Sequence, residues 1–143
     1  MKLSRSLSFY FVMIFFAAGL AVVVWQIVFP EKRSVLVDVT VPKLSQAALE
    51  GKMAFDRVCA ACHGANAAGS DTGPPLVHAI YNPGHHADFA FVLAARRGVR
   101  AHHWKFGDMP PQPDISEAEI AAIVHYVREL QAANGIQYQP HKM

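Results

Sequence analysis

The chain has 143 residues, which is enough for one small domain and one further segment. Hydrophobic residues make up 52% of it and charged residues 17%, and the apolar excess lies mostly near the N-terminus. The net charge is only +2, and Lys2 and Arg5 precede the first acidic residue, so the rest of the chain is near neutral. This charge balance argues against nucleic acid as a partner.

The first predicted element is an apolar helix over residues 7–29. This stretch carries no charge, and a helix of 23 residues is roughly 34 Å long, slightly more than the hydrocarbon core of a bilayer. Lys2 and Arg5 also fit the charged leader of a cleaved signal peptide, but the apolar run is longer than the ~7–15 residues of a signal core. We therefore predict a retained transmembrane anchor over residues 1–30, contacting lipid through residues 7–29, with Pro30 ending the helix.

A linker over residues 31–44 is expected to be extended. Its valines fall on alternate positions, at Val35, Val37, Val39 and Val41, as in a strand with one apolar face. The simpler interpretation is a spacer between membrane and head, and the alternative is a strand that pairs with a partner or with the head. The sequence does not separate these two interpretations.

Three helices are predicted in the head, residues 45–133, which leaves residues 134–143 as a C-terminal tail. The first begins after Ser45 as N-cap and runs towards Cys59, with Leu49, Met53 and Phe55 as its apolar positions. The second covers residues 88–97, with Gly98 at its end. The third begins with the capping box of Ser116 and Glu119, and its apolar stripe is Ile120, Ile123, Val124, Val127 and Leu130. The region between the first two helices is rich in Gly and Pro and is predicted to be loop.

The stretch VCAACHG contains both cysteines of the chain, Cys59 and Cys62, followed directly by His63. A structural zinc site needs four ligands, and no further cysteine is present. A thioredoxin-type redox pair belongs at the start of a helix in a βαβ unit, whereas Cys59 ends a predicted helix. Covalent haem attachment needs this arrangement of two thiols and an imidazole, which lie on one side of a helical turn. The motif therefore predicts one haem c attached through Cys59 and Cys62, with His63 as an iron ligand.

Residues 45–131 resemble a class I cytochrome c in three motifs that occur in the family's order. The first helix carries Gly51 and Phe55 before the haem motif, TGPPL covers residues 72–76, and GDMPPQP covers residues 107–113. The resemblance implies that Gly51 lets the last helix pack close and that Tyr126 packs across the first helix. It further implies that the Pro74 carbonyl accepts the proton of the ligand imidazole, that Leu76 touches the porphyrin, and that Met109 is the sixth iron ligand. The implied fold class is all-α, with three to four helices around a covalent haem, plus the N-terminal transmembrane helix.

Other features near residue 109 favour the same site. Apart from Met143, Met109 is the only methionine after His63, and it stands in a proline-rich loop. Trp104 is expected to pack against the haem or its propionates. Four basic residues lie around Trp104: Arg96, Arg97, Arg100 and Lys105. They form either a positive rim that steers an acidic redox partner to the haem edge or a set that neutralises the two haem propionates.

Seven histidines besides His63 compete with Met109 for the sixth position: His78, His85, His86, His102, His103, His125 and His141. The adjacent pairs 85–86 and 102–103 also suggest a copper or zinc site. Adjacent histidines in a loop are more often solvated at the surface, and we expect the same of these pairs.

A haem with two protein ligands moves one electron and leaves no room for substrate, so the predicted protein is an electron carrier and not an enzyme. The resemblance places the head on the periplasmic side of a bacterial inner membrane, as a single-pass protein. Expected partners are a quinol dehydrogenase and a terminal oxidase or reductase of a respiratory chain. The alternatives are a fixed haem subunit, as in a nitric oxide reductase, and a haem sensor or peroxidase-like protein with a labile sixth ligand.

Overall fold

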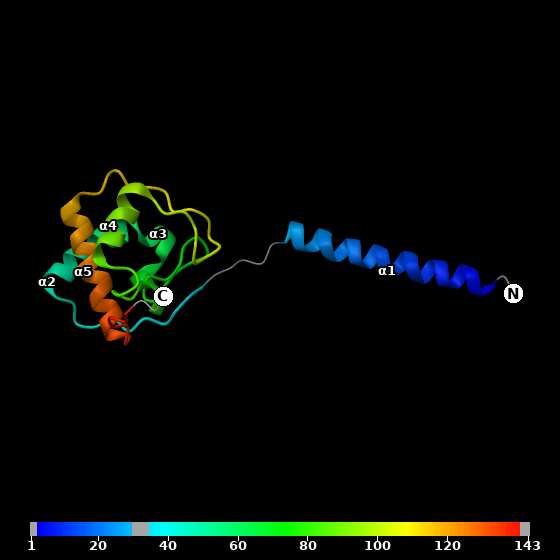
Figure 1. Cartoon of the computed structure of the whole chain (residues 1–143), viewed down its shortest axis with the longest axis horizontal. Coiled ribbons are helices and arrows are strands. Elements are labelled where there is room, and N and C mark those ends of the chain that lie inside the picture. The colour runs from blue at the N-terminus through cyan, green and yellow to red at the C-terminus, as the bar shows by residue number, and fades with distance from the viewer. Residues whose placement is uncertain (1–2, 30–34, 141–143) are drawn as a thin grey trace. The chain divides into compact units, whose positions relative to one another are not determined.

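The computed structural model describes residues 3–29 and 35–140 (Figure 1). Its α-helices are α1 (Leu3–Val28), α2 (Gln46–Val58), α3 (Ala60–His63), α4 (Asp88–Arg97) and α5 (Glu117–Ala133), and two short 3-10 helices are η1 (Ala65–Ala67) and η2 (Ala79–Tyr81). Within the described ranges the chain has no strand, only one isolated antiparallel bridge between Val99 and Met109. The predicted all-α class is therefore confirmed.

The chain divides into two compact units, Met1–Lys32 and Arg33–Met143. In the first unit, Leu7–Val28 is a 22-residue segment of α1 that is long and apolar enough to cross a membrane, and its side chains are exposed. The predicted apolar helix is thus present. Two residues of the predicted anchor lie outside the described residues: Lys2, a predicted leader charge, and Pro30, the predicted end of the helix.

Helix α2 begins where predicted, and one of its three predicted apolar positions is buried. Ser45 is its N-cap, and the Ser45 hydroxyl accepts a hydrogen bond from the Ala48 amide at 3.2 Å. Of the three apolar positions, Phe55 is buried, whereas the side chains of Leu49 and Met53 are 44% and 67% exposed. The helix instead packs through small residues and one aromatic ring: Ala48, Gly51, Ala54 and Phe55.

Helix α5 crosses α2 at Gly51, as the family resemblance implied. A Cβ atom on Gly51 would lie 1.9 Å from the carbonyl oxygen of Ala122, so only glycine permits this approach. Beside the crossing, the Phe55 and Tyr126 rings meet edge to face with centroids 5.5 Å apart, and both side chains are fully buried. The predicted capping box of Ser116 and Glu119 is present, and the predicted apolar stripe of α5 is buried.

Residues 35–44 lie along the head and are not a free spacer. Val37 and Val39 are half-buried against the core, while Leu36, Asp38 and Thr40 are exposed. The Val37 amide donates to the Ala68 carbonyl at 3.0 Å, and Thr40 exchanges two hydrogen bonds with the Asn134 side chain. The spacer interpretation is therefore wrong for these residues, because two of the alternating valines, Val37 and Val39, pack against the core of the head, whereas Val41 is exposed.

Candidate functional site

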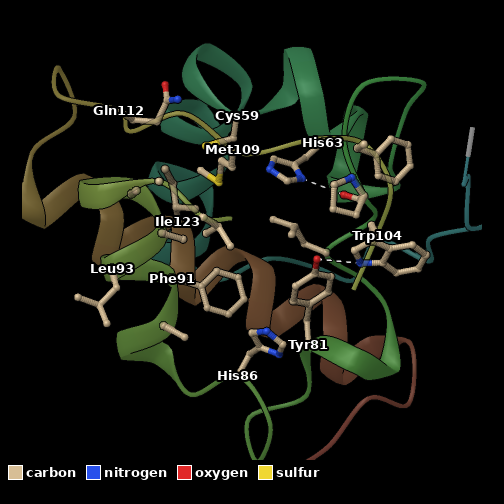
Figure 2. A pocket seen from close by; sticks show the side chains of 18 of the residues that line it. Cys59, His63, Tyr81, His86, Phe91, Leu93, Trp104, Met109, Gln112 and Ile123 are labelled. Carbon is tan, nitrogen blue, oxygen red and sulfur yellow. Dashed lines mark hydrogen bonds between the residues drawn. The ribbon is translucent and has the colours of Figure 1, made fainter. Parts of the chain in front are cut away.

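A cavity of about 390 Å³ lies in the head between α2, α4, α5 and the loops that precede and follow α4 (Figure 2). Its wall is mostly apolar and includes Phe55, Leu76, Phe91, Ala94, Ile120 and Ile123. The polar or sulfur-bearing side chains in the wall are few, and they include Cys59, His63, Tyr81, His86, Trp104 and Met109. Such a wall suits a large apolar group that is bound by a small number of specific atoms.

The two cysteines and His63 lie on one helical turn after α2. The amides of Cys62 and His63 both donate to the Cys59 carbonyl, at 3.1 and 2.9 Å, and this brings the three side chains to one side of the turn. Cys59 lines the cavity, whereas Cys62 is exposed, and both are free thiols. Burial and the neighbouring Cys62 raise the pKa of Cys59 to about 11, although Arg57 acts in the opposite direction. Cys59 is therefore a neutral thiol at pH 7.

The ring of His63 is buried and has a fixed orientation. Its Nδ1 lies 2.8 Å from the carbonyl oxygen of Pro74, and because a carbonyl only accepts, Nδ1 must carry the proton. The implied hydrogen bond between His63 and Pro74 is thus confirmed. Burial lowers the pKa of His63, and the bond to Pro74 opposes that shift only in part. The imidazole is neutral and its Nε2 lone pair is available to a metal ion.

Pro74 and Leu76 belong to a loop that is bonded back to the haem motif. The Ser70 hydroxyl donates to the Cys62 carbonyl at 2.5 Å, and the Leu76 amide donates to the Ala67 carbonyl at 2.9 Å. Gly73 lies so close to the motif that a Cβ there would be 2.6 Å from the Cys62 oxygen. Both Pro74 and Leu76 line the cavity, as the resemblance implied.

Met109 reaches the same cavity from the loop that follows α4. Its backbone pairs with Val99 through two hydrogen bonds of 2.9 Å, and the side chain is half-buried. Both Met109 and His63 line the cavity (Figure 2). The structure therefore brings together the two side chains that were predicted as axial ligands.

Trp104 also lines the cavity, and its polar atom has a protein partner. The indole Nε1–H donates to the Tyr81 hydroxyl at 3.0 Å, and the ring meets His78 edge to face at 5.1 Å (Figure 2). Burial raises the pKa of Tyr81 to about 12, against the lowering effect of the bond from Trp104. Tyr81 was not singled out from the sequence, where an isolated tyrosine in a loop carries no signal.

The basic residues around Trp104 do not form one group. Arg97, Arg100 and Lys105 are exposed, and within the described ranges none of the four predicted cations lines the cavity. Arg96 donates to the Ile115 carbonyl at 3.2 Å and pairs with Glu117. This placement favours a positive outer surface over neutralisation of a group inside the cavity.

Arg128 was missed from the sequence, and it joins α5 to the loop before α4. Its guanidinium donates to the Asp88 carboxylate at 2.8 Å, to the Tyr81 carbonyl at 2.8 Å and to the His86 carbonyl at 2.5 Å. The guanidinium also lies over the Phe91 ring, 4.9 Å from its centroid. One half-buried cation thus positions the wall that carries Tyr81 and His86.

The histidine pairs were expected to be solvated at the surface. His102 and His103 are exposed, and the structure in addition brings the two pairs together. The Nε2 atoms of His85 and His103 are 3.2 Å apart, and the His102 and His103 rings have centroids 4.2 Å apart. His86, His102 and His103 line the cavity.

A family model described as Cytochrome c matches residues 48–131, which contain all of the predicted site residues. No curated protein and no solved structure matches the chain significantly.

Proposed function

The chain belongs to the cytochrome c family, and on this basis we propose that it is a membrane-tethered electron carrier whose haem iron is ligated by His63 and Met109. The family implies covalent haem c, and the two cysteines with His63 fit its attachment motif. When bound, that haem supplies a one-electron couple between ferric and ferrous iron.

The observation that carries the proposal is the convergence of His63 and Met109 on one apolar cavity. Pro74 fixes the tautomer of His63, so that the neutral Nε2 is the atom available to the iron. The bridge to Val99 fixes the backbone of Met109, whose thioether is a neutral, soft ligand. Two protein ligands leave no position for substrate, and this is why electron transfer is favoured over catalysis.

The wall of the cavity determines the direction in which the potential is shifted. Oxidised iron carries one more positive charge than reduced iron, and an apolar wall disfavours that extra charge. The proposed ligands, His63 and Met109, are neutral, so they do not compensate for the extra positive charge of the oxidised iron. We therefore expect a positive midpoint potential, and a redox titration that gave a strongly negative midpoint would contradict the proposed ligation.

Helix α1 is the proposed tether, with the head on the periplasmic side of a bacterial inner membrane. A tether confines the head to the membrane plane and raises its effective concentration near membrane-bound redox complexes. The exposed Arg97, Arg100 and Lys105 support an acidic partner surface. The proposed partners are a quinol dehydrogenase as donor and a terminal oxidase or reductase as acceptor.

Membrane fractionation and purification test the tether and separate a shuttle from a fixed subunit. The full chain is expected to stay in the membrane pellet after a wash at high salt, which removes proteins bound only by charge. Release by salt would contradict the tether. In mild detergent we expect the haem protein to migrate alone, whereas co-purification with a large membrane protein at fixed stoichiometry would favour the subunit alternative.

A further inference from the structure

Two loops that lie far apart in sequence bring four histidines together at the rim of the cavity. His85 and His86 precede α4, and His102 and His103 follow it. The ligand atoms of His85, His86 and His103 all lie within 4.8 Å of one another, and the Nε2 atoms of His85 and His103 are 3.2 Å apart. Nitrogen ligands around a tetrahedral Zn²⁺ ion are about 3.3 Å apart, since each lies about 2.0–2.1 Å from the metal. One pair already has this separation, and the third nitrogen must approach by no more than about 1.5 Å.

The histidine ring nearest the cavity has its second nitrogen occupied by a protein acceptor. His86 Nδ1 lies 2.8 Å from the Ile80 carbonyl oxygen, so Nδ1 carries the proton and Nε2 is left with its lone pair. A metal-ligating histidine almost always has such a partner on its other nitrogen, because that bond sets the tautomer and the ring orientation. The arrangement at His86 therefore matches that of a metal ligand.

The backbone of His85 and His86 is fixed by buried groups. Both amides donate to the Asn82 carbonyl, at 3.0 and 2.9 Å, and the Asn82 side chain is buried and bonded to the same turn. Arg128 donates to the His86 carbonyl from α5. These contacts hold the pair without any contribution from an ion, so the site is largely formed in advance.

The second loop is closed at its base, so that His103 is presented at a defined place. Two bonds of 2.9 Å join Val99 to Met109, and the Ala101 amide donates to the Asp108 carboxylate at 2.8 Å. At the far end of the loop, Trp104 donates to Tyr81, next to the first histidine pair along the chain. Both halves of the cluster are therefore attached to the same segment, residues 81–86.

We propose that His85, His86 and His103 bind a divalent transition-metal ion of the Zn²⁺ and Cu²⁺ class, with water in the fourth position. Imidazole nitrogens suit these ions, whereas Mg²⁺ and Ca²⁺ require oxygen ligands, and the three-residue cluster contains no carboxylate. Two of these residues, His86 and His103, line the same cavity as His63 and Met109, but none of the three is an iron ligand in the function proposed above, and the bound ion goes beyond that function. Bound metal joins the loop that carries Met109 to the loop before α4.

The test is calorimetric titration of Zn²⁺ into the haem-loaded full chain in detergent, without an affinity tag. We expect one ion per chain, and at least a tenfold loss of affinity in each of the variants His85→Gln and His103→Gln. The matched control is His125→Gln, because His125 is exposed on α5 and stands outside the cluster. It should bind Zn²⁺ as the wild type does.

Three results would overturn the proposal. The first is that the wild type shows no saturable Zn²⁺ binding, and the second is that the His85→Gln/His103→Gln double variant binds Zn²⁺ as tightly as the wild type. The third is that the wild type binds Mg²⁺ as tightly as Zn²⁺, which would show a nonspecific charge effect. The first two are expected if the histidines contact the haem propionates instead. A parallel Cu²⁺ titration decides which ion of the class binds more tightly. The haem spectrum of each variant shows whether that variant is folded. The same spectrum reports the iron ligands, so failure of the zinc proposal is distinguishable from failure of the proposed carrier function.

Discussion

Val99 and Met109 face each other in an antiparallel bridge, and the amide of each donates to the carbonyl of the other at 2.9 Å. The bridge closes a loop whose first residue follows directly on Gly98, the C-cap of α4. Gly98 has a φ of +73°, and a Cβ on it would lie 2.4 Å from the Met109 carbonyl oxygen. The position of the proposed sixth ligand thus depends on glycine at the end of a helix.

We expect Gly98→Ala to weaken the ligation of iron by Met109. The added methyl group collides with the Met109 carbonyl, which displaces the bridge. The measurement is carbon monoxide binding by the reduced, haem-loaded chain, which should rise above that of the wild type. Gly107→Ala is the matched control, because Gly107 has a φ of +93° but no atom near its absent Cβ. If both variants bound the gas equally, backbone strain and not the contact with Met109 would be responsible.

Gly51→Ala should destabilise the head by about 1–3 kcal/mol or more, because the methyl group overlaps the Ala122 backbone where α2 crosses α5. Denaturant unfolding followed by haem absorbance measures the change. Met53→Ala in the same helix is the control and should stay within about 0.5 kcal/mol, since Met53 is 67% exposed. A larger loss in the Met53 variant would contradict the exposed position of Met53 in the structure.

Trp104 and Tyr81 should be energetically coupled through their 3.0 Å hydrogen bond. We expect Tyr81→Phe and Trp104→Phe each to reduce the free energy of unfolding, and the double variant to lose about 1 kcal/mol less than the sum of the two. Tyr138→Phe is the control, because Tyr138 is 69% exposed. Additive losses would mean that the bond contributes nothing to the stability of the haem-loaded protein.

The acid stability of the head should depend on Glu129. Hydrogen bonds from the Ser45 hydroxyl and amide lower the pKa of Glu129 below its ordinary value of 4.5. A lowered folded-state pKa stabilises the fold above pH 4.5, and that contribution is lost as the pH falls through the folded-state value. The Glu129→Gln variant should therefore lose less stability than the wild type between pH 7 and acid. Glu50→Gln, which alters an exposed residue of α2, should follow the wild type in the same unfolding series.

The parts of the site that were predictable depend on short spacing or on the family pattern. The turn from Cys59 to His63 follows from helical geometry, and the bond from His63 to Pro74 follows from the motif. The close packing at Gly51 also follows from the family pattern. Hydrophobicity alone would not indicate it, because Leu49 is exposed and the helix crossing requires the smaller residue.

Other contacts had no local signal in the sequence. Arg128 binds two backbone carbonyls and a carboxylate that only the tertiary fold brings together. The same is true of the histidine pairs, which α4 separates in sequence and the two loops reunite. The packing of residues 35–39 against the head could not be predicted either. The alternation of valines indicates an extended segment with one apolar face, but it does not show what that face contacts.

The most direct test of the proposed ligation is the absorption spectrum of the reduced, haem-loaded full chain, recorded with and without carbon monoxide. With His63 and Met109 both bound, the spectrum should not change when the gas is added, whereas in Met109→Ala it should shift and the midpoint potential should fall. A clear shift in the wild type would contradict the account, because it would show that the sixth position opens and would favour the sensor or peroxidase-like alternative.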